Sequence, residues 1–251
     1  MPQSSGQVWS AECYQTHAAF VPAFGEELVS WLAPQRGERI LDLGCGDGTL
    51  TEILGASGAT VVGVDGSFAM ASAARHRGLP VIVMDGQALA FARTFDAAFS
   101  NAAMHWMHDA DAVAAGVRRA LRPGGRFVGE FGGHGCVAAI RTAVLAVLER
   151  RGVELRSPWY FPSADTYRAV LERHGFEVAR IVVFPRPTPL PTGIRGWLET
   201  FGGPMLGALA PGERADAVDE IERLLHQALC DEQGRWTADY TRLRFSATRL
   251  A

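Results

Sequence analysis

A glycine-rich loop between an apolar strand and a helix constrains the fold more than any other feature of this chain. The segment Ile40–Thr49 reads ILDLGCGDGT, and the apolar run Arg39–Leu43 before the glycines predicts a buried strand. A helical pattern begins directly at Thr49. Glycines let a backbone approach a ligand without a Cβ in the way, and a helix N-terminus offers free N–H groups to it. The segment therefore predicts a strand–loop–helix ligand site of the kind found in parallel α/β sheets.

Short apolar runs and helical stretches alternate from about residue 37 to residue 131. This order predicts βαβ units on a parallel sheet. Prolines and glycines in Arg122–Gly125 are expected to end the last of these helices. The predicted strands are Arg39–Leu43, Thr60–Val64, Val81–Met84, Phe95–Ser100 and Arg126–Phe131, and the predicted helices are Thr49–Ala56, Phe68–Arg77 and Asp111–Leu121.

The second half of the chain predicts two further strands, Glu177–Phe184 and Arg242–Arg249, as an antiparallel pair that completes the sheet. Between them lie the proline-rich stretch PRPTPLPTG and helical patterns, which we expect to form a lid. We therefore predict a single domain over 1–251: an N-terminal helical cap in 1–36, a ligand-binding core in 37–135, and the remaining sheet in 136–251 with a helical cap inserted at about 186–232. The predicted helices of this half are Ile140–Arg151, Ser163–His174, Ile194–Phe201 and Ala215–Leu229.

The chain contains no lysine, so all of its 24 basic residues are arginines. This excludes a Schiff base, a phosphate-binding P-loop lysine and the Tyr-x-x-x-Lys pair of short-chain dehydrogenases. The net charge of −3 gives no reason to expect a nucleic-acid binder. The four cysteines are scattered, the first residues lack a signal-peptide pattern, and no apolar run is long enough to span a membrane. We expect a cytoplasmic protein without a membrane partner.

The loop spacing and two acidic residues limit the choice of cofactor. The loop reads G-x-G-x-G, whereas dinucleotide enzymes carry G-x-G-x-x-G, because position 49 is Thr. Asp42 lies inside the first predicted strand, and Asp65 ends the second, about 20 residues after Gly44. A carboxylate at that place can bind the ribose hydroxyls of either S-adenosylmethionine (SAM) or NAD.

Several motifs in series resemble those of class I SAM-dependent methyltransferases. VVGVDGSFAM follows ILDLGCGDG, and then come Asp85-Gly86, FDAAFSNAAMHW and LRPGGRF. The resemblance implies a Rossmann-like α/β fold with a seven-stranded, mostly parallel sheet, an antiparallel last strand and a helical cap. It also implies SAM as cofactor and S-adenosylhomocysteine as product. The segment SNAAMHW in addition resembles the trans-aconitate and malonyl-carrier-protein methyltransferases, which methylate carboxylates.

The resemblance implies a cofactor role for ten residues. The glycines of the loop would lie against the methionine part of SAM, two acids would bind its ammonium and ribose groups, and a third would accept a hydrogen bond from the adenine amino group. In that order of contact from ammonium to adenine the residues are Asp42, Gly44, Gly46, Asn101, Asp65, Gly66, Met70, Asp85, Gly86 and Gln87.

The acceptor side offers candidates in loops at the carboxyl ends of the predicted strands and in the cap. We predict no metal site, since a carboxylate acceptor needs no base and a phenol or alcohol needs only a group such as His. A histidine in such a loop is nevertheless more often structural or solvated than catalytic. The catalytic candidates are His105, His134 and Tyr14, and the predicted substrate pocket contains Tyr14, His17, Trp106, Trp159 and Tyr160.

The sequence bears on three other functions. An NAD(P)-dependent oxidoreductase is disfavoured by the loop spacing and the absent lysine. A SAM-binding protein that regulates a partner without methylating anything fits the same motifs. A methyltransferase acting on nucleic acid or protein is disfavoured by the charge and by Asn101-Ala102-Ala103-Met104, where amide and base N-methylating relatives carry an Asn-Pro-Pro-Tyr-like tetrapeptide. We expect transfer of a methyl group to a carboxylate or hydroxyl oxygen of a small molecule, by a monomer or homodimer.

Overall fold

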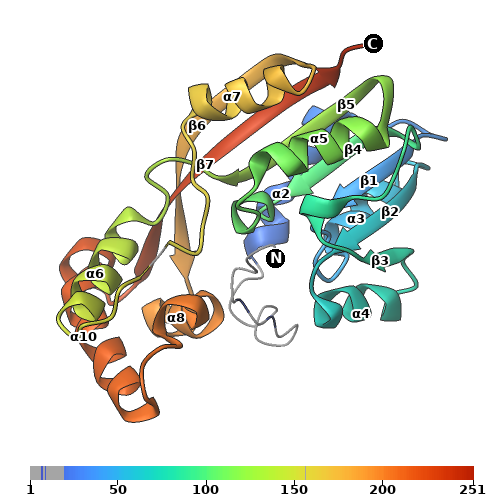
Figure 1. Ribbon diagram of the computed structural model, residues 1–251. Helices are drawn as coiled ribbons and strands as arrows, with labels where there is room; N and C mark the ends of the chain where they lie inside the picture. The colour runs from blue at the N-terminus through green and yellow to red at the C-terminus, as the bar shows by residue number, and fades with distance from the viewer. Residues whose placement is uncertain (1–6, 8, 10–19, 156) are drawn as a thin grey trace. The chain divides into compact units, whose positions relative to one another are not determined.

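The computed structural model describes residues 7, 9, 20–155 and 157–251 (Figure 1). They divide into two compact units: one consists of 135–159 and 184–241 with Gln7 and Trp9, and the other of 20–134, 160–183 and 242–251. The second, larger unit contains the predicted ligand-binding core and is called the sheet unit below; the first is called the helical unit. The predicted cap boundaries remain a prediction.

The strands of the described chain form one seven-stranded sheet in the order β3-β2-β1-β4-β5-β7-β6. Strands β1 to β5 pair in parallel, and β7 pairs antiparallel with β5, as predicted. The strand order reverses between β1 and β4, where such sheets bind ligands at the carboxyl ends of the strands. The strands are β1 Arg39–Leu43, β2 Thr60–Asp65, β3 Val81–Val83, β4 Phe95–Asn101, β5 Leu121–Gly132, β6 Phe176–Leu190 and β7 Trp236–Arg249.

Helices cover both faces of the sheet in the sheet unit. Alternation along the strands explains this, because successive side chains point to opposite faces. In β4, Ala98 packs in the cluster under α5 (Ala110–Ala120) and α7 (Ala164–Arg173), whereas its neighbours Ala97 and Phe99 pack in the cluster under α2 and α3. Phe95 also packs in the first cluster, because the strand register shifts between Phe95 and Ala97. The other helices of this unit are α2 Phe20–Leu32, α3 Thr49–Gly55, α4 Phe68–His76, η1 Gly86–Ala88 and η2 Met104–Trp106.

Strands β5, β6 and β7 are longer than predicted. Strand β6 continues through the proline-rich stretch, which we expected to be part of the lid. Its prolines, Pro185, Pro187 and Pro189, alternate, so their missing N–H groups all fall on one side of the strand. Because β6 is at the end of the strand order, that side can be an unpaired edge, where proline is tolerated and blocks further strand addition.

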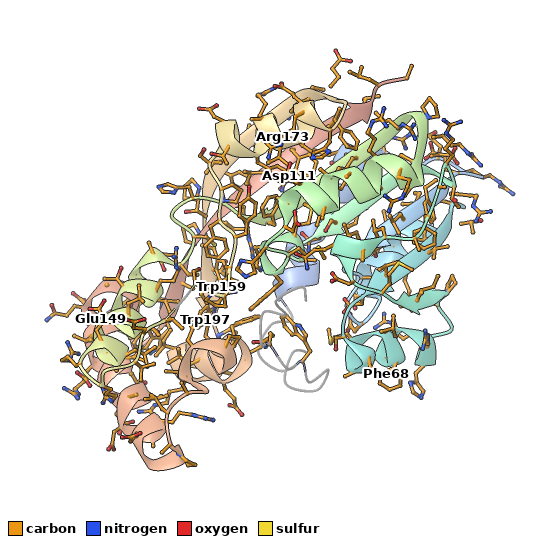
Figure 2. All side chains as sticks on the ribbon, viewed as in Figure 1. Phe68, Asp111, Glu149, Trp159, Arg173 and Trp197 are labelled. Atoms are coloured by element: carbon orange, nitrogen blue, oxygen red, sulfur yellow. The ribbon has the colours of Figure 1, made fainter. Side chains whose placement is uncertain are left out.

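The helical unit contains the helices predicted for the inserted cap. Its interior is aromatic: the rings of Trp159 and Trp197 lie 6.1 Å apart (Figure 2), and the Trp197 indole N–H donates to the Tyr240 hydroxyl at 2.7 Å. No helix in the described part of the chain is both long and apolar enough to cross a membrane. The helices of this unit are α6 Ala138–Glu149, α8 Gly193–Phe201, α9 Gly203–Leu206 and α10 Pro211–Leu229.

Candidate functional site

The three glycines of the loop after β1 meet different surroundings. Gly44 and Gly48 have φ angles of +74° and +87°, and a Cβ on them would lie 2.1 Å from Ala103 Cβ and 2.3 Å from Leu79 Cδ1. Gly44 is therefore required by the packing of the protein itself, whereas a side chain at Gly48 would strain the backbone and displace the flexible end of Leu79. Gly46 also has a positive φ, but its Cβ would meet only Met70 Cε, at 3.5 Å. The space beside Gly46 is open to a ligand.

Asp65, at the end of β2, is tied to this loop. Its two carboxylate oxygens accept hydrogen bonds from the N–H of Gly46 at 2.9 Å and of Ser67 at 2.8 Å. Burial raises the pKa of Asp65, although the two N–H donors oppose the effect. The neighbouring Gly66 is exposed, and a Cβ there would meet only Met84 O, at 3.9 Å. A fixed carboxylate beside open backbone fits the predicted ribose contact.

Asp42 lies inside β1 and is only 2 % exposed. The hydroxyl of Thr51, on α3, donates to its Oδ2 at 2.7 Å. Burial raises the pKa of Asp42 to about 7, and the nearby charge of Asp65 adds to the effect. A buried carboxyl group with one partner favours a cationic ligand, because the positive charge would stabilise its ionised form. The predicted ammonium contact fits this chemistry.

The third predicted acid caps the short helix η1. The side chain of Asp85 accepts from the N–H of Gln87 at 2.9 Å, and the Gln87 side-chain oxygen accepts from the N–H of Asp109 at 2.9 Å. A Cβ on the buried Gly86 would lie 2.7 Å from the Met107 side chain. These contacts hold the loop after β3 against the loop after β4.

The carboxyl ends of β1 and β4 are joined where the strand order reverses. The Ser100 hydroxyl donates to the carbonyl of Leu43 at 2.8 Å, which places Asn101 next to the glycine loop. Ala102 then adopts a φ of +54°, rare for a residue with a side chain, and its N–H donates to the carbonyl of Glu130. The structure thus brings Gly44 and Asn101 to the same edge of the sheet, where β1, which contains Asp42, also ends.

His105, in η2, is 8 % exposed. Its Nδ1 accepts the N–H of Gly132 at 3.3 Å, and its own carbonyl accepts the N–H of Tyr160 at 2.8 Å. Burial, followed by the charge of Arg242, lowers the pKa of His105 well below its ordinary value. A neutral imidazole that accepts at Nδ1 carries its proton on Nε2. In this form Nε2 of His105 can donate a hydrogen bond, while Nδ1 is engaged by Gly132.

The other predicted acceptor residues are dispersed. His134 is exposed on the sheet unit, and Tyr160 lines a cavity of about 500 Å³ together with His108, Asp111 and Arg173. Trp106 is half-buried beside His105, at a ring distance of 5.4 Å, whereas Trp159 belongs to the helical unit. Tyr14 and His17 lie outside the described residues. The assignment of these residues to catalysis or to a substrate pocket remains a prediction.

Two further residues lie close to predicted cofactor residues but were not named as site candidates. Thr51 holds Asp42, and Phe68, two residues after Gly66, is 71 % exposed at the start of α4 (Figure 2). A large aromatic side chain exposed beside the acid that ends β2 can stack on a planar ring. The apolar Phe68 within GSFAM was the only signal for this. Among the described residues, no group of three or more His, Cys, Asp or Glu could hold a metal ion.

Known proteins match this chain over the core and over its whole length. A methyltransferase-domain family matches residues 41–129. An uncharacterized methyltransferase of Schizosaccharomyces pombe is 37 % identical over 95 % of this chain and 97 % of its own length. A malonyl-[acyl-carrier protein] O-methyltransferase of Erwinia billingiae is 32 % identical over 47 % of this chain and 48 % of its own length. Partial matches extend to demethylmenaquinone methyltransferases and to a tRNA carboxymethyltransferase.

Solved structures share the fold. Phosphoethanolamine N-methyltransferase 2 of Haemonchus contortus, in complex with S-adenosylhomocysteine, covers 91 % of this chain with a TM-score of 0.59 and 20 % identity; this chain covers 53 % of it. The sheet order, the glycine loop and the three acids define a Rossmann-like enzyme that binds an adenosyl cofactor. The chain belongs to the class I SAM-dependent methyltransferases, and SAM is its cofactor.

Proposed function

We propose that this methyltransferase acts on a small molecule and transfers the methyl group to a carboxylate oxygen. When bound, SAM supplies an electrophilic methyl group on a sulfonium sulfur. The observation that carries the proposal is the environment of His105, a buried histidine just beyond the carboxyl end of β4: its Nδ1 accepts the N–H of Gly132, which leaves Nε2 as a hydrogen-bond donor. A phenol or alcohol needs a base to remove its proton, whereas a carboxylate is already ionised at neutral pH.

The charge around His105 supports an anionic acceptor. Arg242 is 5 % exposed on β7, opposite Gly132 in the strand register, and its charge reaches His105. A buried arginine and an imidazole N–H together can orient a carboxylate and offset its negative charge. The partial match to a malonyl-carrier-protein O-methyltransferase agrees with an oxygen acceptor.

Cofactor binding can be tested by calorimetric titration of SAM and S-adenosylhomocysteine. Because Asp65 is fixed by Gly46 and Ser67, we expect Asp65→Ala to weaken both ligands at least about tenfold through the lost ribose contacts. Asp216→Ala is the matched control, since Asp216 is an exposed acid on α10. Equal affinities in the two variants would contradict the role assigned to Asp65.

The acceptor class can be tested by a pH profile of turnover. With SAM saturating at every pH, a carboxylate acceptor should react at a rate that changes little between pH 6.5 and 8.5, since the acceptor needs no base and is itself ionised there (~pH 4 for a free carboxyl). A rate that rises with pH, on phenols or alcohols but not on carboxylates, would refute the proposed acceptor. Tight cofactor binding without turnover of any acceptor would instead favour the regulatory alternative.

A further inference from the structure

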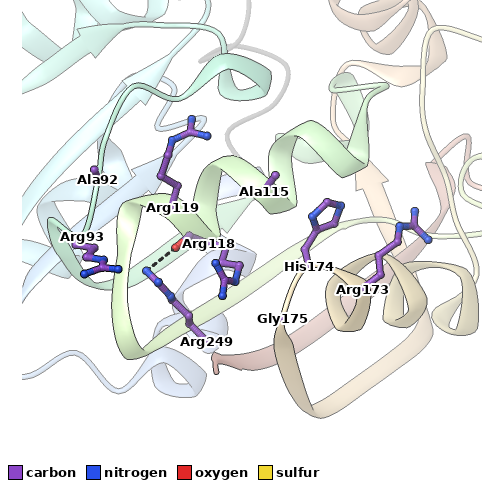
Figure 3. Close-up of a pocket in the computed structure, with 9 residues that line it drawn as sticks. All are labelled: Ala92, Arg93, Ala115, Arg118, Arg119, Arg173, His174, Gly175 and Arg249. Atoms are coloured by element: carbon purple, nitrogen blue, oxygen red, sulfur yellow. Dashed lines mark hydrogen bonds between the residues drawn. The ribbon is translucent and has the colours of Figure 1, made fainter. Parts of the chain in front are cut away.

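An arginine-lined cavity lies on the sheet unit, away from the glycine loop. It measures about 690 Å³ and is lined by five arginines, with His174 and Gly175 between them (Figure 3). We call it the arginine cavity: Arg93, Arg118, Arg119, Arg173 and Arg249. Arg93 precedes β4, and Arg118 and Arg119 end α5 just before β5. The cavity is therefore at the amino ends of β4 and β5, whereas the cofactor loop follows the carboxyl end of β1.

The positive charge of this cavity is only partly neutralised. Arg173 and His174 both contact the carboxylate of Asp111. Arg119 donates to the carbonyl of Leu89. Within the described part of the chain, Arg93, Arg118 and Arg249 form no ion pair with a carboxylate. Three guanidinium groups thus share a cavity in which nothing described here balances their charge.

Arg249 provides the strongest argument for a ligand in this cavity. It is 6 % exposed, and its Nη1 donates to the carbonyls of Arg118, at 2.9 Å, and Leu121. Its Nε–H is buried and has no acceptor among the described residues. Burial, with the charges of Arg118 and Arg93, lowers the pKa of Arg249. A buried cationic donor without an acceptor is unfavourable unless an anion binds there and accepts its hydrogen bond.

Helix electrostatics explains only part of this arrangement. Cations are favourable at the last turn of α5, where Arg118 and Arg119 lie, and Arg249 Nη1 satisfies two carbonyls there. That leaves the Arg249 Nε–H and the Arg93 side chain unaccounted for. Gly175 also makes room for the cluster, because a Cβ on it would lie 2.8 Å from Arg118 Nε.

We propose that the arginine cavity binds a phosphoryl group, as inorganic phosphate or as the phosphate of a phosphorylated metabolite. Guanidinium groups from the loop before β4, from α5 and from β7 approach it from different sides (Figure 3). A tetrahedral phosphate offers oxygens in several directions at once, whereas the two oxygens of a carboxylate are coplanar. Since the cavity is separate from the glycine loop, the anion binds without displacing the cofactor.

The test is calorimetric titration of the full chain with inorganic phosphate and with glycerol phosphate, at constant ionic strength in sodium chloride. Arg93→Asn and Arg118→Gln each remove one charge-assisted contact, and we expect about tenfold weaker binding in each. Arg93 has a φ of +48°, which asparagine tolerates well, so Arg93→Asn should fold normally. Arg223→Gln, on the exposed face of α10, is the control with the same charge change and should bind like the parent chain.

The outcomes distinguish a site for free phosphate from a site for a phosphorylated metabolite, and both from a nucleic-acid surface. Binding of inorganic phosphate alone supports a free-ion site, and equal or tighter binding of glycerol phosphate supports a metabolite site. No heat of binding above the sodium chloride background, or equal affinity in Arg93→Asn, Arg118→Gln and Arg223→Gln, overturns the proposal. Tight binding of an RNA oligonucleotide without binding of either phosphate would also overturn it, in favour of a nucleic-acid surface.

Discussion

We expect Asp42 to couple protonation to cofactor binding, because its predicted partner is the ammonium group of SAM. Its carboxyl group is buried in β1, accepts one hydrogen bond from Thr51, and has a pKa raised to about 7. Below that pH the ligand-free protein holds a proton on Asp42, and above it the group is ionised. Because an ammonium group stabilises only the ionised form, binding at lower pH requires the release of this proton.

We therefore expect the affinity for S-adenosylhomocysteine to fall as the pH is lowered from 7.5 to 5.5. The limiting slope is about tenfold per pH unit below the pKa of Asp42, and the ligand amino group (pKa about 8) stays protonated throughout. Asp42→Asn should bind more weakly at pH 7.5 and show little slope, as measured by calorimetry. An unchanged slope in this variant would assign the titration to another group.

Substitution of different glycines in the loop should lower the free energy of unfolding by different amounts. Gly44→Ala adds a Cβ at 2.1 Å from Ala103 Cβ, whereas Gly46→Ala meets only Met70 Cε at 3.5 Å, and both positions have positive φ. Backbone strain alone costs about 1–2 kcal/mol, so Gly46→Ala should lose that much free energy of unfolding and Gly44→Ala clearly more. Urea denaturation measures the difference. Equal losses would mean that Ala103 moves aside without cost.

A buried ion pair joins elements of the sheet unit. Arg244 on β7 donates to Glu130 on β5 at 2.7 Å, and also pairs with Glu27 on α2 at 2.8 Å. The side chains of Arg244 and Glu130 are each 3 % exposed. The ion pair therefore connects β7 both to β5 and to α2.

Removing only the arginine should destabilise this unit strongly. Arg244→Met leaves the buried Glu130 carboxylate without its arginine, and we expect a loss of about 3–5 kcal/mol in the free energy of unfolding. Adding Glu130→Leu should recover most of it, because no buried charge then lacks a partner. Arg195→Met is the matched control: Arg195 also contacts two carboxylates, but its side chain is 52 % exposed, so about 1 kcal/mol or less should be lost.

A double variant as unstable as Arg244→Met would give a different explanation. The guanidinium of Arg244 lies 5.1 Å from the ring centre of Trp31. The loss would then come from this contact and from the missing volume of the arginine, and the buried charge would matter little.

Local patterns predicted the elements whose ends are set by local chemistry. Strand β1 begins and ends where expected, because a buried apolar run stops at a glycine with positive φ. The predicted extent of β6 was wrong, because its prolines are typical of a loop. They are compatible with a strand here because β6 lies at the end of the sheet. That position depends on contacts between distant parts of the chain.

The same distinction applies to the site. Asp42 and Asp65 were predicted from their places in and at the end of a strand, whereas Asp85 was predicted from the resemblance to the methyltransferase motifs. Spacing could not rank His105 against His134, because burial depends on tertiary packing: His105 is buried and its Nδ1 accepts the N–H of Gly132, whereas His134 is exposed. The acceptor candidates therefore remain less defined than the cofactor residues.

At the scale of the whole molecule, β6 and β7 run through both units. Residues 176–183 and 242–249 belong to the sheet unit, while 184–190 and 236–241 belong to the helical unit. Each unit thus depends on strands whose other halves are ordered in its neighbour. Continuous strands make cooperative unfolding the natural expectation, because breaking one half of a strand removes support from the other.

We expect amide hydrogen exchange under increasing urea to show one global opening for α10 in the helical unit and β4 in the sheet unit. S-adenosylhomocysteine at 100 times its Kd should raise the opening free energy of both by about 2.7 kcal/mol. If α10 opens with a lower free energy that the ligand does not change, the two units unfold independently.

The unequal roles of the three loop glycines bear on how descendants of this enzyme would change. A lineage that stopped methylating its acceptor would still be held to Gly44 and Gly48, because the folded chain has no room for a side chain at Gly44, and one at Gly48 would strain the backbone and displace Leu79. Gly46 faces open space, so selection for the cofactor bears mainly on that one position of the loop. Most of the loop motif would then be retained in the sequence after the activity is lost. Drift at Gly46 and Asp65, in a chain that keeps Gly44 and Gly48, would be the mark of a relative that folds but no longer binds SAM.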